Sequence, residues 1–388
     1  MEKWCAMENM GGKLNLMSNS MGFINSYTYD GFRYFSNVDF NGLFRQNIAD
    51  ENIEFIDYFS DELLTRRLIH RTVIGVDERM FFFPLFGNGI TEYHVSEKKF
   101  HFWEVNGKKR VWGFSGVFPY NKEIILIPCS LTKYFLTFNV DTLELNYISA
   151  FKEKLKSNGI NRVDIDLFGS VLYKDSVYIA LCETNLILEM DLKSYQVDVH
   201  AVEDGIHFRN LNIIDGNLWG TTTDNGVVLK IDLEFWNLKK IPLVGLNNIH
   251  RSVLIVEKWK DQIIVIPGTG NQLFQLENDS FQLCDRDLPK ERLGNVIGYF
   301  IDRDLHLYSQ KGDGEAGKMV AGSTIIPSDT KLEVYGKSLK FEGYELVKRD
   351  IRKRCINDEL AKTGHLLEAS EGINTLKNYL EWVKNDEL

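Results

Sequence analysis

Polar turns and apolar strands follow one another along this chain in a pattern that repeats seven times. Each unit opens with a polar turn and an apolar strand, such as Glu123-Ile-Ile-Leu-Ile-Pro128, and continues into two further strands with alternating apolar positions. Set in register, the units start at Asp30, Asp77, Asn121, Lys174, Asp215, Lys260 and Asp302. Repeats of roughly 40–50 residues with four strands each are typical of propeller blades. The pattern therefore predicts an all-β fold, a seven-bladed β-propeller of four-stranded antiparallel blades.

Asparagine recurs at one place in the second turn of the units, and Asn-Gly pairs such as Asn225-Gly226 are strong hairpin signals. Because Asn tolerates a left-handed backbone, we expect left-handed hairpin turns at four positions. These are Asn41, Asn88, Asn185 and Asn271. The first strand of each unit precedes its start, and small residues in it predict that the sheets converge on a central channel. The glycines concerned are Gly75, Gly113, Gly169 and Gly298.

The repeat predicts one propeller domain over residues 21–336. We expect residues 1–20 to form an N-terminal arm that closes the ring, and residues 337–388 to form a helical C-terminal cap. Apolar side chains at helical spacing indicate the cap, namely Leu376, Tyr379, Leu380 and Val383. A basic run at residues 348–354 precedes them and is expected to be solvated or to contact a partner. A short helix over residues 150–156, ended by Asn158-Gly159, predicts an insertion on the face where propellers bind ligands.

Composition narrows the function classes. A net charge of −10 and a pI near 5.4 argue against general affinity for nucleic acid or for an anionic membrane. The five cysteines are scattered without metal-ligand spacing, and Cys129 and Cys182 are expected to be small buried side chains at strand ends that form no disulfide. The N-terminal residues do not resemble a secretion signal, and no apolar run approaches membrane-spanning length. We expect a cytoplasmic protein without metal or cofactor.

The repeat resembles the broad superfamily of bacterial seven-bladed β-propellers, whose members include kelch-like, WD40-like and lyase-type proteins. No motif of a subfamily is present: the chain lacks a Gly-His…Trp-Asp pair, a kelch double glycine and a sialidase Asp-box. Units such as Asn185-Leu-Ile-Leu-Glu-Met-Asp-Leu192 resemble those of uncharacterised propellers of gut bacteria, some of which accompany surface-polysaccharide genes. The resemblance implies the fold and leaves the activity open.

Basic and imidazole residues gather where the predicted first strands begin. In a propeller these positions surround one mouth of the channel. Arg offers a fork of donors for carboxylate or phosphate, and His transfers protons near neutral pH. The candidate ligand-binding residues are Arg71, Arg110, Arg162, Arg209, Asn210 and Arg251, and the candidate acid–base residues are His70, His207 and His250. The alternative is that these arginines pair with carboxylates of a neighbouring blade, for which Asp164, Asp166, Glu203 and Asp204 are candidates.

Two further motifs have structural explanations. Asp164 and Asp166 share one face of an extended segment, as a metal or acid–base pair would, but a turn or an Arg partner is the expected role. Gly312-Asp-Gly-Glu-Ala-Gly-Lys318 matches most of a P-loop, yet Met319 replaces its Ser or Thr and we expect two strands around it. We therefore expect a binding module for an anionic small molecule, a sugar derivative or a protein partner. A propeller enzyme (lyase, epimerase or hydrolase) and a protein-interaction scaffold are the alternatives.

Overall fold

The computed structural model describes residues 23–38, 41–50, 52–62, 69–105, 113–131, 134–148, 151–160, 165–167, 169–182, 184–222, 226–244, 253–259, 261–267, 272–287, 295–301, 305–312, 319–326 and 337–338. All of them belong to one compact unit, Met1–Phe341; a second unit is Glu342–Leu388. The predicted N-terminal arm and residues 339–388 of the predicted helical cap lie outside the described residues. The first two residues assigned to the cap, Lys337 and Ser338, instead form a strand that pairs with the strand before it, so the predicted boundary at residue 336 is wrong. No described helix is long and apolar enough to cross a membrane.

The strands follow one another in sets of four. The first four sets are β1 (Tyr27–Tyr29), β2 (Phe32–Ser36), β3 (Leu43–Asn47) and β4 (Ile53–Asp57); β5 (His70–Val76), β6 (Arg79–Pro84), β7 (Gly89–His94) and β8 (Lys99–Glu104); β9 (Phe114–Tyr120), β10 (Glu123–Pro128), β11 (Phe135–Asn139) and β12 (Leu145–Ile148); and β13 (Ser170–Tyr173), β14 (Ser176–Ala180), β15 (Leu186–Asp191) and β16 (Val197–Ala201). The others are β17 (Phe208–Ile214), β18 (Asn217–Thr222), β19 (Val227–Asp232) and β20 (Leu238–Val244); β21 (Val253–Trp259), β22 (Gln262–Pro267), β23 (Gln272–Glu277) and β24 (Ser280–Asp287); and β25 (Asn295–Ile301), β26 (Leu305–Gly312), β27 (Met319–Ile326) and β28 (Lys337–Ser338).

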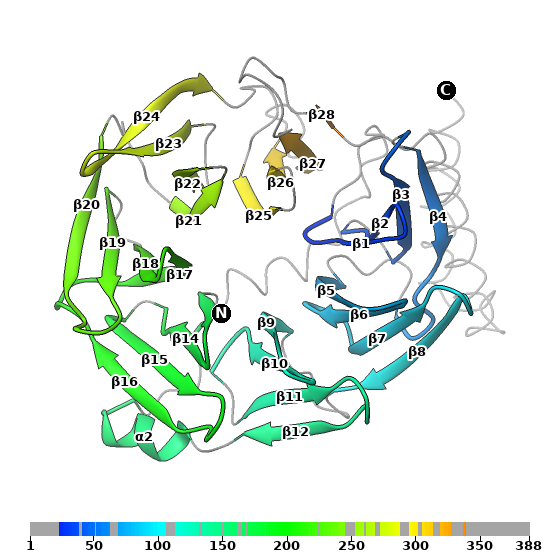
Figure 1. The fold of residues 1–388 in the computed structure, drawn as a ribbon, viewed down its shortest axis with the longest axis horizontal. Coiled ribbons are helices and arrows are strands. Elements are labelled where there is room, and N and C mark those ends of the chain that lie inside the picture. The colour runs from blue at the N-terminus through cyan, green and yellow to red at the C-terminus, as the bar shows by residue number, and fades with distance from the viewer. Residues whose placement is uncertain are drawn as a thin grey trace, which may run out of the picture. The chain divides into compact units, whose positions relative to one another are not determined.

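Five of these sets are separate four-stranded sheets, and consecutive strands within every set pair antiparallel. The sets β17–β20 and β21–β24 form one eight-stranded sheet, because β20 and β24 pair in parallel at Leu243–Phe281 and Val244–Gln282. First strands of successive sets contact one another, from β1 and β5 through β9, β13 and β17 to β21 and β25. Figure 1 shows the first strand of each set innermost and the fourth outermost.

The turns between the first and second strands confirm the register of the repeat. Five described unit starts have a positive φ, as a tight two-residue hairpin requires. They are Asp30 (47°), Asp77 (53°), Asn121 (55°), Lys174 (54°) and Asp215 (49°).

The prediction for the second turns is wrong at Asn41, Asn88 and Asn185, none of which has a positive φ. Their side-chain amides donate hydrogen bonds instead. Asn41 Nδ2 donates to the backbone oxygens of Phe59 (2.8 Å) and Glu62 (3.0 Å), and Asn185 Nδ2 donates to that of Val202 (2.9 Å). These bonds hold the chain as it leaves the fourth strand. Asn271 lies outside the described residues.

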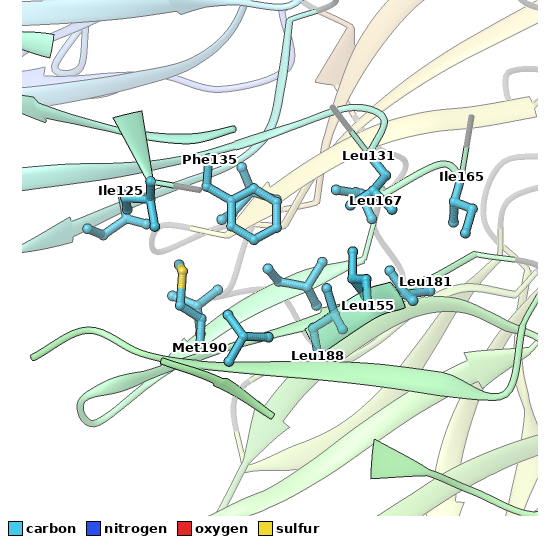
Figure 2. Packing of buried hydrophobic residues seen from close by; sticks show 14 of the residues in the cluster. Ile125, Leu131, Phe135, Leu155, Ile165, Leu167, Leu181, Leu188 and Met190 are labelled. Atoms are coloured by element: carbon cyan, nitrogen blue, oxygen red, sulfur yellow. The ribbon is translucent and has the colours of Figure 1, made fainter. Parts of the chain in front are cut away.

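Apolar side chains between successive sets form the core. Figure 2 shows one such layer, in which Ile125 and Phe135 of the set β9–β12 face Leu188 and Met190 of the set β13–β16. Leu155 of helix α2 (Phe151–Ser157) joins the same cluster. The helix is present as predicted, but it packs against β16, the outermost strand of its set, rather than beside the first strands.

Three glycines confirm that neighbouring sets approach closely at or beside their first strands. A Cβ atom at Gly169 would lie 2.6 Å from Asn210 Cα, across the contact between β13 and β17. A Cβ at Gly75 would overlap the Tyr27 ring, and one at Gly113 would overlap the Leu85 backbone. Any side chain at these positions would force neighbouring sets apart.

Candidate anion site at the mouth end

We call the end of the sets at which their first strands begin the mouth end. Backbone hydrogen bonds link this end from β5 to β17, alternately within a set and between sets. The donor and acceptor pairs are Leu85–Ile69 (2.8 Å), Gly113–Leu85 (2.9 Å), Cys129–Gly113 (2.8 Å), Leu167–Cys129 (2.8 Å), Cys182–Asp166 (3.0 Å) and Phe208–Thr184 (3.0 Å). Side chains at the starts of the first strands are therefore held at fixed places relative to one another.

A β-bulge occupies the same place in four of the first strands. In β5 the pairs His70–Pro84 and Thr72–Phe83 leave Arg71 without an opposite residue, and in β17 the pairs Phe208–Thr222 and Asn210–Thr221 do the same for Arg209. The equivalent residues of β9 and β21 are Ser115 and Leu254. A bulge turns a side chain away from the regular alternation of its strand. Arg71 and Arg209 therefore occupy structurally equivalent positions.

Both arginines are half-buried and lack a counter-ion within the part of the chain that the structure describes. Neither guanidinium makes a hydrogen bond or an ion pair with a described residue. Burial lowers the pKa of Arg209 from its ordinary value, and the Cys182 thiol acts in the opposite direction. Arg still stays charged at neutral pH. The two positive charges are therefore not neutralised by the described residues.

Two of the four carboxylates expected to pair with these arginines bond to other side chains. Glu203 accepts a hydrogen bond from Lys240 Nζ at 2.8 Å, and Asp204 accepts one from Asn185 Nδ2 at 3.2 Å. Asp164 lies outside the described residues. The structure therefore gives no support to salt bridges from Arg71 or Arg209 to Glu203 or Asp204.

A row of five residues connects the two arginines, and we call it the mouth row: Arg71, Cys129, Asp166, Cys182 and Arg209. Burial raises the pKa of the Cys129 thiol to about 12, with Arg71 lowering it and Asp166 raising it. The backbone N–H of Cys182 donates to the backbone carbonyl oxygen of Asp166, and Cys182 Sγ lies 3.7 Å from the backbone carbonyl oxygen of Arg209. Neither cysteine forms a disulfide with a described residue, as predicted; Cys129 is buried as expected, whereas Cys182 is only partly buried. The mouth row thus carries charges in the order positive, negative, positive.

His70 has a packing role. Its ring is buried beside Phe59 and Phe82, with centroid distances of 4.4 and 5.5 Å, and its Nδ1 lies 3.1 Å from Ser36 Oγ. Burial lowers the pKa of His70 to about 3, so the imidazole is neutral at physiological pH. A neutral ring enclosed by aromatic side chains does not reach a ligand at the mouth end.

His207 is the histidine that the structure exposes at the mouth end. The strand register shows that Phe208, not His207, is the equivalent of His70, because each pairs with the last residue of its second strand. Asn210 uses its Oδ1 to accept the N–H of Leu211 at 2.9 Å. Arg209 and Asn210 lie at the start of β17, directly after His207 and Phe208 in the chain. The remaining candidates, Arg110, Arg162, His250 and Arg251, lie outside the described residues.

Sequence reasoning missed the role of Ser115. Its hydroxyl lies within hydrogen-bond distance of the Ile127 (3.3 Å) and Pro128 (3.1 Å) oxygens and also bonds the Leu167 oxygen, so at this bulge the side chain satisfies the backbone. The available signal was position, because each bulge residue lies at one fixed distance before the start of its unit.

The P-loop-like segment joins the antiparallel strands β26 and β27, as predicted.

No family model matches the chain, and no curated protein matches it in sequence. Solved structures do. Virginiamycin B lyase from Staphylococcus aureus has a TM-score of 0.55 at 9% identity, with 75% of this chain and 92% of that chain covered. YCF48 bound to D1 peptide has a TM-score of 0.58 at 10% identity, with 80% and 93% covered. The extracellular domain of a putative hybrid two-component system from B. thetaiotaomicron has a TM-score of 0.57 at 14% identity, with 83% and 42% covered.

These similarities define the class of the fold. The lyase and YCF48 are β-propeller proteins, and this chain shares their fold of four-stranded antiparallel sheets. At identities of 9 to 14% the likeness concerns the fold alone. One of these neighbours is an enzyme and another is bound to a peptide, so the fold is compatible with catalysis and with binding.

Proposed function

We propose that this chain is a seven-bladed β-propeller that binds an anionic ligand at its mouth end. The seven sets β1–β4 to β25–β28 support the blade number. Arg71 and Arg209 hold the ligand through its carboxylate or phosphate oxygens, which suit the guanidinium fork. Ligands of this kind include acidic carbohydrate derivatives and sugar phosphates.

One observation carries this proposal: the arginines occupy equivalent bulges, are half-buried, and have no counter-ion among the described residues. A partly desolvated charge costs free energy unless an opposite charge compensates it. A structural arginine in this environment is expected to pair with a carboxylate. An arginine reserved for a ligand stays unpaired until the ligand arrives.

Thermal unfolding at constant ionic strength tests the proposal. Phosphate or sulfate should raise the Tm relative to chloride, with a stabilisation of about 2.7 kcal/mol at a hundred times the Kd, and a neutral sugar should not. Arg209→Ala should reduce the shift, the double substitution Arg71→Ala with Arg209→Ala should abolish it, and both variants should leave the unliganded protein folded. Arg209→Lys, which keeps the charge but loses the fork, should retain only part of it.

Arg45→Ala is the matched control. Arg45 is also half-buried, but it is ion-paired with Glu54 at 2.6 Å in β3 and does not belong to the mouth row. This variant should lose some stability and keep the full anion shift. If neither phosphate nor sulfate shifts the parent Tm, the anion site is wrong and a protein-interaction scaffold becomes the better description.

His207 favours a second candidate, a propeller enzyme. Its side chain is exposed and lies two residues before Arg209 in the chain, and in this second proposal it exchanges a proton with the ligand that Arg209 holds. His207→Ala should then abolish turnover and leave the anion-dependent Tm shift intact. Loss of the shift in this variant would show that His207 contributes binding instead.

A further inference from the structure

Arg71 and Arg209 belong to sets that are separated by two others. Their strands β5 and β17 are connected through β9 and β13, each of which contacts the next. One small oxyanion can bond both guanidinia only if they lie within about 6 Å of each other, since each hydrogen bond spans about 2.9 Å. Two complete sets lie between β5 and β17, so the starts of these two strands are not adjacent. The two arginines are therefore separate anchor points.

The middle of the mouth row has the opposite charge. The Asp166 carboxylate lies between the arginines along the row, close enough to Cys129 to affect its thiol. Two backbone hydrogen bonds hold this residue in place. The backbone carbonyl oxygen of Asp166 accepts from Cys182 N–H, and the N–H of the neighbouring Leu167 donates to the backbone oxygen of Cys129. A third negative charge at the centre of a bound ligand would be repelled, whereas a hydroxyl or an ammonium group would be favoured.

We propose that the ligand of the mouth end carries two oxyanion groups separated by a spacer without negative charge, one group for Arg71 and one for Arg209. This inference rests on the proposed function and specifies its ligand class, which includes dicarboxylates and compounds with two separate phosphates. Once one end is bound, the second end binds as an intramolecular event. A ligand of matching length therefore binds at least about tenfold more tightly than a monoanion.

Calorimetric titration of the full chain at constant ionic strength tests whether the ligand has two oxyanion groups. The probes are α,ω-dicarboxylates from malonate to suberate and the monocarboxylates from acetate to hexanoate. The dicarboxylate affinity should pass through a maximum with chain length and exceed that of every monocarboxylate by tenfold or more. Arg71→Ala and Arg209→Ala should each reduce the best dicarboxylate to the affinity of a monocarboxylate, and Asp166→Asn should allow citrate, with its central carboxylate, to bind more tightly.

Failure of the inference differs from failure of the proposed function. If monocarboxylates and dicarboxylates bind equally, and only one of the two arginine variants weakens binding, the two-anchor ligand is refuted and a single anion site remains. If neither carboxylates nor phosphate bind at all, both proposals are refuted. Circular dichroism of each variant at the titration temperature separates loss of binding from loss of folding.

Discussion

Acid sensitivity centred on His70 is the prediction that the structure supports with the clearest magnitude. The pKa of this buried imidazole is lowered to about 3 from the usual 6.5 of an exposed histidine. Between these two values the unfolded chain binds a proton that the folded chain does not. The free energy of unfolding therefore falls as the pH falls through this window.

The size of the effect follows from about 1.36 kcal/mol per pKa unit. At pH 5 the unfolded imidazole is protonated and the folded one is not, so His70 alone lowers the stability by about 2 kcal/mol relative to pH 7.5. Near pH 3 the loss is about 4 kcal/mol, an upper limit because the chain can open locally around a charged ring. The ring is fully enclosed, so solvent does not screen this cost.

Urea unfolding of the parent and of His70→Asn at pH 7.5 and pH 5 measures this pH-dependent loss of unfolding free energy. Asn places a polar atom close to the position of Nδ1, which keeps a partner for Ser36 and removes the titration. We expect the parent to lose about 2 kcal/mol more than the variant between these pH values. Ser36→Ala is the control: it loses about 1 kcal/mol at both pH values and keeps the parent's pH dependence. Equal pH dependence in the parent and His70→Asn would refute the reasoning.

Three further substitutions test how the sets are held together. Asn41→Ala removes two donated bonds and the 2.8 Å bond that its Oδ1 accepts from Phe59 N–H, so urea unfolding should show a loss of about 2–4 kcal/mol; a loss below about 1 kcal/mol would contradict it. Gly169→Ala should lower the free energy of unfolding by about 1–3 kcal/mol, because the added Cβ presses on β17 beside Arg209. It should also weaken anion binding, since the start of β17 has to shift. Unchanged anion binding would contradict this expectation. Leu155→Ala should cost about 2–5 kcal/mol, since this helix side chain is 4% exposed in the core, whereas a near-zero change in Tm would show that α2 is peripheral.

The sequence predicted the parts of the fold that depend on local chemistry. A two-residue hairpin needs a residue that accepts a positive φ, so the starts Asp30, Asp77, Asn121 and Asp215 are visible in the chain. Lys174 adopts the same conformation without the usual preference for it and was found only through the repeat. Glycines at the convergence of the first strands were visible for a similar reason, since only their size fits.

Features set by contacts distant in sequence were missed or misjudged. The left-handed Asn41 was a reasonable prediction, but its amide finds partners after β4 that no local pattern reveals. The pairing of β20 with β24 depends on how two outer strands meet. His70 and His207 look alike in sequence, yet His207 lies one residue farther from its unit start, so Phe208 and not His207 takes the position of His70. The arginines were found from their chemistry and from their comparable places in the repeat, and the strand register adds that both are bulge residues.

The measurement that tests the central claim most directly is a crystal structure of the protein soaked in selenate. Selenate resembles sulfate and scatters anomalously at the selenium edge, so a bound anion is located without ambiguity against the methionine sulfurs. The account predicts an anomalous peak whose oxygens lie about 2.9 Å from the guanidinium nitrogens of Arg71 or Arg209. Both guanidinia without selenate, and each paired with a carboxylate of a neighbouring set, would contradict it.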